Sequence, residues 1–252
     1  MLPEAWNLTG RVALLAGNGR RGNPVLAAGL AEAGADVAVA GAPQEELAEA
    51  EQRVHAAGRR SLALPTDVTR EEEVAAAVAR VVGQWGRLDI LVTNIQVEWG
   101  RPFVETTAAE WDALMQRNVR SLFLLCREAG QQMLRQGGGR IVNILSGLAE
   151  RGLWNATAYC ASQGAVLQLT RALALEWSRS NIRVNALGTG WLSVEEPSPE
   201  EQQQDRLTQY IPLRRKGRPE DLVAALVYLA SDACDYTVGS TIYIDGGLMA
   251  HA

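Results

Sequence analysis

The sequence predicts one α/β domain, with an open parallel sheet and helices on both of its faces. Short apolar runs alternate with longer amphipathic segments along the chain, which is the pattern of repeated strand–helix–strand units. The 252 residues, 47% of them hydrophobic, suit a single globular core of this kind. No linker, repeat or low-complexity tract divides residues 1–252. The expected fold is therefore a single-domain Rossmann fold.

Seven short apolar runs supply the expected strands. They cover residues 12–16, 36–40, 61–64, 88–93, 140–145, 182–187 and 241–244. In an open parallel sheet, ligands bind at the carboxyl ends of the strands, near the point where the strand order reverses. The residues that follow each strand are therefore the first candidates for a site.

The expected helices lie between the strands, and several carry start signals. They cover residues 24–33, 44–57, 69–85, 107–136, 157–179 and 219–229. Thr69 with Glu72, and Thr107 with Glu110, have the spacing of capping boxes. Pro219 suits the first turn of the last helix.

Charge and composition exclude several classes of function. The net charge is −5 and no Lys/Arg-rich run is present, so neither nucleic acid nor an anionic membrane is an expected partner. The longest uncharged run, residues 152–170, is too polar to span a bilayer, and the N-terminus has no apolar signal segment. The cysteines are few and scattered, which predicts reduced thiols in the cytoplasm: Cys126, Cys160 and Cys234. The two histidines have no metal partner in the sequence, so no metal site is expected.

The loop after the first expected strand carries a candidate nucleotide motif. Gly17, Gly19 and Gly22 spell G-x-G-x-x-G between a strand and a helix, which is the context in which this motif binds dinucleotides. Asn23 and Pro24 form a favourable N-cap and first-turn pair, so the start of the next helix can attract an anion. A plain strand–helix connection, with its arginines in water, explains the same residues.

Several segments resemble the short-chain dehydrogenase/reductase family, over nearly the whole chain. The segments that carry the family's active-site residues match RNVRSLFLL around Asn118, GRIVNILSG around Ser146, and AYCASQGAV around Tyr159. Further matches are NIRVNALGTG and GSTIYIDGG. The resemblance is to the classical type of this family, and it implies the Rossmann fold that the strand pattern predicts.

The resemblance implies a proton-transfer site. Tyr159 would give or take the proton on the substrate oxygen, Ser146 would polarise that oxygen, and Asn118 would hold a water that relays protons. The family's lysine, four residues after the tyrosine, is replaced by Gln163, which donates hydrogen bonds but has no charge. A tyrosine without a neighbouring cation titrates near ~10. This change weakens a base more than an acid, so any activity should favour carbonyl reduction.

The resemblance also implies an atypical cofactor site. When the loop is aligned with the family motif T-G-x-x-x-G-x-G, Gly17 is the first glycine, and Arg21 and Asn23 replace the other two. Asn94 is kept from the family's N-N-A-G segment, but Gln96 stands in place of its glycine. Large side chains at these positions should crowd a dinucleotide. Binding is therefore expected to be weak or lost.

Other positions favour NADP(H) if a dinucleotide binds. Arg20 stands where many NADP-binding members have an arginine for the 2′-phosphate. The second strand ends in Ala40, Gly41 and Ala42, with no acid to hold a ribose diol. The pair Asp67-Val68 matches the family position that meets the adenine ring.

The substrate side is expected to be apolar. Trp99, Trp154 and Trp191 follow three different strands and could line a pocket for an apolar small molecule. Packing of a lid or a subunit contact explains them equally well. Residues 191–210 are polar, acidic and contain proline, which predicts a mobile lid.

These patterns lead to a poor or silent dehydrogenase as the expected function, with Asn118, Ser146 and Tyr159 retained beside an eroded cofactor site. Such a chain could be a non-catalytic subunit of an active paralogue. The alternatives are an NADP(H)-dependent carbonyl reductase, and a cofactor-independent enzyme or lyase that uses Ser146 and Tyr159 as halohydrin dehalogenases use their Ser-Tyr pair. Family members pair their two long helices, so a homodimer, a homotetramer or a hetero-oligomer is expected.

Overall fold

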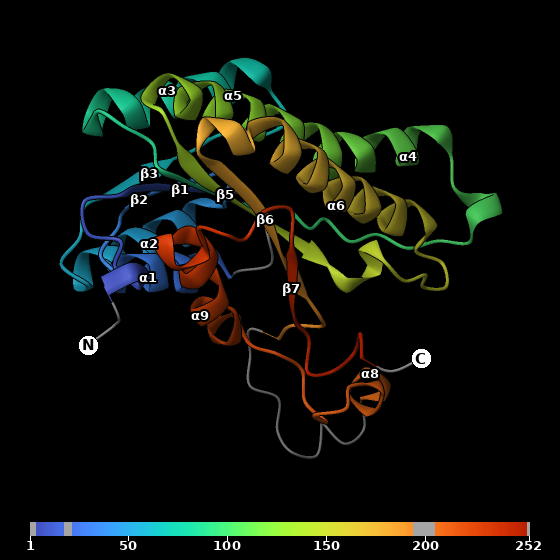
Figure 1. The fold of residues 1–252 in the computed structure, drawn as a ribbon. Helices are drawn as coiled ribbons and strands as arrows, with labels where there is room; N and C mark the ends of the chain where they lie inside the picture. The colour runs from blue at the N-terminus through green and yellow to red at the C-terminus, as the bar shows by residue number, and fades with distance from the viewer. Residues whose placement is uncertain (1–3, 18–21, 194–204, 251–252) are drawn as a thin grey trace.

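The computed structural model describes residues 4–17, 22–193 and 205–250, and it confirms the predicted α/β fold (Figure 1). Within these residues, every strand pair of the sheet is parallel, and the strand order is β3-β2-β1-β4-β5-β6-β7. The strands are β1 (Val12–Ala16), β2 (Asp36–Ala40), β3 (Ser61–Leu64), β4 (Ile90–Asn94), β5 (Gly139–Ser146), β6 (Ile182–Thr189) and β7 (Thr241–Ile244).

Helices cover both faces of the sheet. One face carries α3 (Glu71–Trp85), α5 (Ser121–Gln136) and α6 (Thr157–Trp177), and the other carries α1 (Asn23–Glu32), α2 (Gln44–Ala56) and α9 (Pro219–Ala230) (Figure 1). Figure 1 also shows α4 (Ala108–Met115) on the side of α5 and α6, and the short α8 (Arg206–Tyr210) beside the C-terminal segment.

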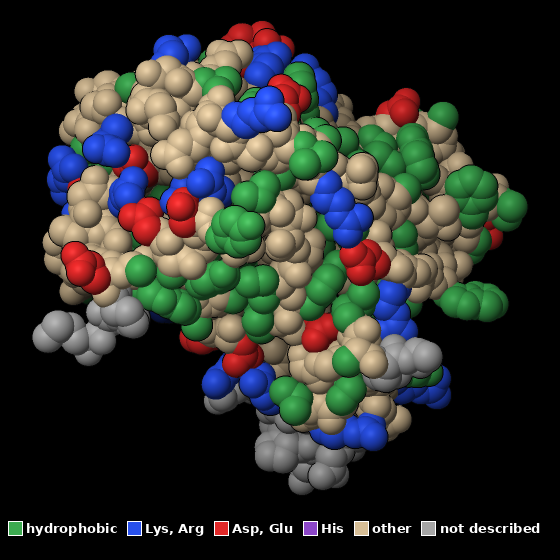
Figure 2. All heavy atoms as spheres, viewed as in Figure 1, with side chains coloured by type: hydrophobic (Ala, Val, Ile, Leu, Met, Phe, Trp, Pro, Cys, Tyr) green, Lys and Arg blue, Asp and Glu red, His purple; other side chains and the backbone are tan. Residues whose placement is uncertain are grey.

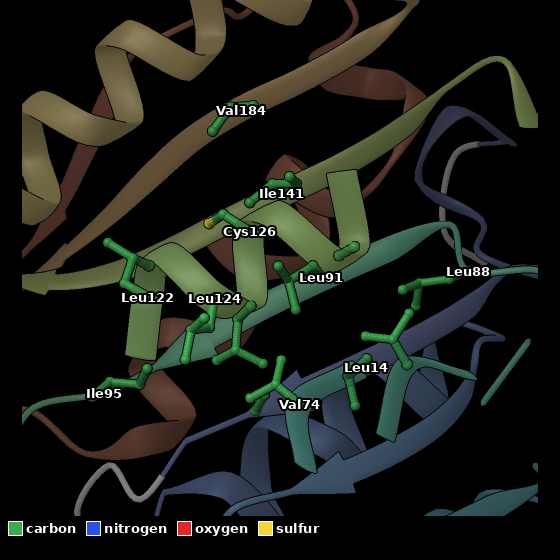
Figure 3. Close-up of a cluster of buried hydrophobic side chains, with 14 of the residues drawn as sticks. Leu14, Val74, Leu88, Leu91, Ile95, Leu122, Leu124, Cys126, Ile141 and Val184 are labelled. Carbon is green, nitrogen blue, oxygen red and sulfur yellow. The ribbon is translucent and has the colours of Figure 1, made fainter. Parts of the chain in front are cut away.

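The core consists of two apolar layers that the sheet separates. Because side chains alternate along a strand, Leu14 packs under α3 and α5 (Figure 3), whereas Leu15 faces α1, α2 and α9. Leu122 and Leu124 of α5 and Val74 of α3 complete the layer that Figure 3 shows. All of β1 is buried, which explains its uninterrupted apolar sequence.

The amino ends of the strands are held by charged side chains. Asp89, just before β4, is 4% exposed. It accepts a hydrogen bond of 2.8 Å from the backbone N–H of Val12, and bonds of 2.8 and 2.6 Å from the Arg87 guanidinium. Arg140 of β5 bonds to Asp232 at 3.1 Å. These interactions tie the start of the sheet together at the edge opposite the strand carboxyl ends.

Two helix starts differ from the expected ones, while one is confirmed. The capping box of Thr107 and Glu110 is present at the start of α4. The one expected at Thr69 is absent, because the Thr69 hydroxyl bonds to the carboxylate of Asp67 at 2.6 Å and α3 begins after Arg70. Helix α1 begins at Asn23 with Gly22 as its N-cap, one residue earlier than expected.

The long helix expected over residues 107–136 is interrupted. A π-helical turn, η3 (Gln116–Arg120), separates α4 from α5. Such turns insert one residue into a helix and occur often at functional sites. Asn118 lies in the middle of this turn and is fully buried.

Three further features of the chain concern its surface charge, membrane-spanning character and metal-binding groups. On the face drawn in Figure 2, basic and acidic side chains are intermixed, with hydrophobic side chains between them. Within the described ranges, no helix combines the length and apolar character that crossing a membrane requires. The same part of the chain contains no group of three or more His, Cys, Asp or Glu side chains arranged to hold a metal ion.

Candidate active site

The strand order reverses between β1 and β4, and the candidate site lies at the carboxyl ends of these strands. β1 pairs with β2 on one side and with β4 on the other, which is the switch point where ligands bind in open α/β sheets. β4, β5 and β6 run further than the sequence predicts and end at Asn94, Ser146 and Thr189. Each of these polar residues is thus placed by a buried strand.

Two asparagines fix the loop that follows β1. The Asn23 side chain is fully buried, and its Nδ2 donates to the carbonyl of Gly17 at 2.8 Å. The Asn94 Nδ2 donates in turn to Asn23 Oδ1 at 2.8 Å. Gly17 has φ +130°, and a Cβ there would lie 2.3 Å from the Asn94 carbonyl oxygen, so a side chain is excluded.

This arrangement changes the interpretation of Asn23. The sequence predicts that its side chain crowds a dinucleotide, but the structure buries it under the loop, where it bonds to backbone and to Asn94. The backbone N–H groups in the first turn of α1 remain available for an anion. Arg20 and Arg21, the other predicted residues of this loop, lie outside the described residues.

A cavity of about 430 Å³ lies beyond the ends of β2 and β3. Gly41, Asp67, Val68 and Arg117 are among its lining residues. Hydrogen bonds from the Thr69 side chain and backbone hold the pKa of Asp67 below its ordinary value, so this carboxylate stays ionised. The sequence predicts Asp67 and Val68 here. It gives no signal for Arg117, because α4 and the η3 turn bring that residue to the cavity from a distant segment.

A larger cavity, about 680 Å³, lies beyond the ends of β5 and β6, and both Ser146 and Tyr159 line it. Ser146 ends β5, and Tyr159 lies in the first turn of α6. Gln163 follows one turn after Tyr159 and is fully buried. Its Oε1 accepts a hydrogen bond of 2.9 Å from the backbone N–H of Ser146. Its Nε2 is buried without a hydrogen-bond partner among the described residues.

The Asn118 side chain has a positioning role in the structure. Its Oδ1 accepts from the backbone N–H of Val97 at 3.0 Å, and its Nδ2 donates to the Val97 carbonyl at 3.1 Å and to Ser162 Oγ at 3.0 Å. Ser162 Oγ donates to the Tyr159 carbonyl at 2.7 Å. Both N–H donors of Asn118 are thus used to hold the chain after β4 against the start of α6.

The larger cavity has mixed walls. The three tryptophans that the sequence points to, Trp99, Trp154 and Trp191, all line it. α8 and the C-terminal turn also contribute lining residues: Leu207, Tyr210, Leu248 and Met249. The first two fall within the predicted lid, whereas Leu248 and Met249, which follow the last strand, were missed by sequence reasoning. Two charged side chains stand among the lining residues, Glu98 and Arg151. Of the predicted lid, residues 191–193 and 205–210 are described, and 194–204 lie outside the described residues.

A narrow hollow adjoins the larger cavity at the carboxyl edge, and the two share Glu98, Thr189 and Gly190 as lining residues. Gly22, Asn94, Gln96 and Thr189 are among its lining residues. The Gln96 Nε2 reaches toward Thr189 Oγ1 at 3.5 Å. The three hollows follow one another from β2 across the switch point to β6, which is the path that a dinucleotide takes in a sheet of this kind.

Comparison with known proteins identifies the family. Residues 25–249 match the protein family described as enoyl-(acyl carrier protein) reductase. The chain belongs to the short-chain dehydrogenase/reductase family. This short-chain dehydrogenase/reductase is 38% identical to a 2-dehydro-3-deoxy-D-gluconate 5-dehydrogenase of Dickeya dadantii, with 99% of this chain and 100% of the relative aligned. It is 33% identical to a gluconate 5-dehydrogenase of Gluconobacter oxydans, with 98% and 97% aligned.

Solved structures of family members have the same fold. A gluconate 5-dehydrogenase from Burkholderia cenocepacia, in complex with NADP and tartrate, is 31% identical and superposes with a TM-score of 0.89, covering 99% of each chain. A short-chain type dehydrogenase/reductase from Mycobacterium marinum is also 31% identical, with a TM-score of 0.89 and 98% of each chain covered.

The comparisons correct the expected function. Relatives that are 31–38% identical over nearly the full length are named dehydrogenases and reductases, which supports a working NAD(P)-dependent enzyme. The prediction of a poor or silent dehydrogenase, or of a non-catalytic subunit, is therefore wrong, and the cofactor-independent alternative is set aside with it. The expected weakening of dinucleotide binding is not supported either. Its physical basis fails at Asn23, whose side chain turns away from the ligand path.

Proposed function

We propose that this protein is an NADP(H)-dependent oxidoreductase that interconverts a secondary alcohol and a ketone on a polyhydroxy carboxylic acid of the gluconate kind. The observation that carries the proposal is the placement of Ser146 and Tyr159 on the wall of one cavity beside the switch point of the sheet. The relatives' names support the substrate class, and the Burkholderia cenocepacia relative binds NADP and tartrate, itself a hydroxy acid.

The described residues divide the work of the reaction among them. Tyr159 transfers the proton to or from the substrate oxygen, and Ser146 holds that oxygen by a hydrogen bond. Gln163 positions Ser146 through its backbone N–H, and Asn118 positions the chain after β4. A bound nicotinamide cofactor supplies or accepts the hydride.

The cofactor would lie along the three hollows of the carboxyl edge. Gly17 and Gly22 leave room for backbone to approach the pyrophosphate at the start of α1. Asp67 and Val68 line the cavity that suits the adenine ring, and Asn94 holds the loop between the two ends. Arg20 is the proposed partner of the 2′-phosphate. The absence of an acid in the sequence Ala40-Gly41-Ala42 supports NADP(H) over NAD(H).

We propose that Gln163 makes the active site of this family member atypical. The neutral amide stands where the family's lysine is expected, so proton transfer at Tyr159 takes place without a fixed cation one helical turn away. A neutral tyrosine is ready to donate a proton but must ionise before it accepts one. We therefore propose that carbonyl reduction is the favoured direction.

The test is NADPH oxidation by the purified chain with 5-keto-D-gluconate, and NADP⁺ reduction with 2-dehydro-3-deoxy-D-gluconate, each compared with the non-phosphorylated cofactor. We expect turnover with NADPH and a loss of at least ~100-fold in Tyr159→Phe, because a general acid contributes on that scale. Tyr228→Phe, which removes a hydroxyl bonded to Thr237 at 2.9 Å outside both cavities, is the matched control. Equal turnover by Tyr159→Phe and the unmodified chain would refute the proposal.

We also propose that the chain forms a homodimer or homotetramer through α5 and α6. Phe123 on α5 is 46% exposed and Leu175 on α6 is 79% exposed, so both helices offer apolar side chains for an isologous contact. Light scattering at micromolar concentration is expected to give a dimer or tetramer. A Leu175→Glu variant should shift the mass toward the monomer, and a wild-type monomer would contradict the proposal.

A further inference from the structure

Arg151 lines the larger cavity and forms no ion pair with any side chain in the described part of the chain. It shares the lining with Ser146 and Tyr159, and it follows the short turn η4 (Gly147–Ala149) that leaves β5. Its Nη1 donates to the Leu248 carbonyl at 2.5 Å. Among the described residues, no carboxylate forms an ion pair with it, whereas Arg101 pairs with Glu110 and Arg171 with Glu150.

The bond to the Leu248 carbonyl orients the guanidinium but does not use all of its N–H donors. A guanidinium has five N–H donors, so most of its donors remain for a ligand. The turn that carries Leu248 is itself held in place, because Asp245 accepts from the backbone N–H groups of Gly247 at 2.9 Å and Met249 at 2.7 Å. Arg151 is therefore presented to the cavity from two ordered segments.

The surroundings of Arg151 favour an anionic ligand. Trp99, Trp191 and Met249 stand among the lining residues, and apolar walls strengthen the attraction between a cation and a carboxylate that enters. Glu98, the other charged residue of the lining, repels a carboxylate. Of the charged groups among the described lining residues, only Arg151 can therefore attract a carboxylate.

We propose that Arg151 binds the carboxylate of the substrate and thereby selects sugar acids over neutral polyols of the same length. This inference rests on the proposed function for its substrate class. Arg151 is a binding residue in it, and the proton chemistry stays with Tyr159 and Ser146. A cavity of about 680 Å³ accommodates a six-carbon acid.

The first test measures binding without turnover. Tryptophan fluorescence titrations with gluconate and sorbitol compare two six-carbon ligands that differ in the carboxylate. We expect the unmodified chain to bind gluconate more tightly, and Arg151→Gln to weaken gluconate binding between about tenfold and a hundredfold, which is the range for a charge-assisted hydrogen bond. Sorbitol binding should change less than about threefold. Equal affinity of the unmodified chain for both ligands would overturn the proposal, whatever the enzyme's activity.

The second test separates this role from a structural one. With 5-keto-D-gluconate as substrate, Arg151→Gln should raise KM by the same factor and change kcat little, because the carboxylate is bound equally in ground and transition states. Arg151→Lys should recover part of the loss, and Arg101→Gln should leave KM unchanged. If Arg151→Gln weakened the binding of neutral polyols and of acids by the same factor, Arg151 would only hold the Leu248 turn. That result would refute its role as the carboxylate-binding residue. Absence of any keto-acid turnover by the unmodified chain would refute the proposed function, while the binding titration would still decide the role of Arg151.

Discussion

The two ends of the sheet use polar side chains in opposite ways. At the amino ends of the strands, Asp89 and Asp36 are buried and paired with arginines. At the carboxyl ends, buried neutral groups bond to one another beside the ends of β4 and β5, as Asn94 does to Asn23, and Gln163 to the Ser146 backbone. Buried ion pairs thus tie the amino ends of the strands together, whereas buried neutral amides fix the strand ends beside the candidate site.

The largest effect is expected at the amino end. Asp89→Asn should lower the free energy of unfolding by about 3 kcal/mol, because it leaves the Arg87 guanidinium and the Val12 N–H with a weaker, neutral partner. Asp232→Asn is the matched control at the same end. Its side chain is 58% exposed, so a loss below about 1 kcal/mol is expected. Urea unfolding measures both, and similar losses for the two variants would break the contrast between buried and exposed charge.

Placing a charge at the neutral end sharpens the comparison. Gln163→Lys puts an ammonium one helical turn from Tyr159. A cation at that range lowers the pKa of a neighbouring acid by about one to three units. The pH at which alcohol oxidation reaches half its maximal rate should fall by that amount. The unfolding free energy should also fall, because the bond to the Ser146 N–H is lost at a buried position. Gln131→Lys, at an exposed position of α5, is the control, and an unchanged pH profile in Gln163→Lys would contradict the neutral-amide account.

The asparagine bridge predicts a smaller and more local effect. Asn23→Ala removes two buried hydrogen bonds and leaves the Gly17 carbonyl and the Asn94 amide each with one bond fewer, so a loss of about 2 kcal/mol in unfolding free energy is expected. The loop should also hold NADPH less tightly, which fluorescence titration measures. Asn7→Ala at an exposed position provides the reference. An unchanged NADPH affinity would show that the bridge stabilises the fold alone.

The smallest expected effect is the pH-dependent contribution of Asp36, at the start of β2, to the stability of the fold. Burial raises the pKa of Asp36, but hydrogen bonds from Arg60 and the charges of Arg59 and Arg60 outweigh it, so the net pKa lies below the ordinary value of 3.8. A depressed carboxyl pKa stabilises the fold above the unfolded value and loses that contribution as the pH falls through the folded value. Asp36→Asn should therefore be about 1 kcal/mol less stable at pH 7. The difference in unfolding free energy between the variant and the unmodified chain should shrink as the pH falls below about 4. Urea midpoints that differ equally at pH 3 and pH 7 would contradict this.

Much of the fold follows from local sequence patterns, and the exceptions have local causes. The bounds of β1, β2, β3 and β7 agree with the apolar runs, because a buried parallel strand needs little beyond such a run. The start of α3 was misplaced, since Thr69 satisfies the Asp67 carboxylate in place of the helix N-terminus. The break at η3 contains neither glycine nor proline and depends on tertiary contacts of Asn118.

The site residues, like the elements of the fold, fall into those that local sequence patterns predict and those that depend on tertiary contacts. Short motifs were sufficient to find Ser146, Tyr159 and the Asp67-Val68 pair, which the structure places on the cavities. The direction in which the Asn23 side chain turns is set by Asn94, 71 residues away, and no local pattern reveals it. Arg151 was missed for a similar reason, because its importance depends on which residues surround it.

The π-helical turn at Gln116–Arg120 has a consequence for the phase of the helices on either side of it. Each residue of an α-helix advances the side chains by about 100° around the axis. The wider π-helical turn absorbs one extra residue, so α4 and α5 keep nearly the phase of one continuous helix. A residue inserted between Leu114 and this turn would have no such turn to absorb it, and would rotate Leu114 by about 100° out of its buried position. Sequence insertions should therefore be tolerated in the loop before α4 far better than within α4 itself.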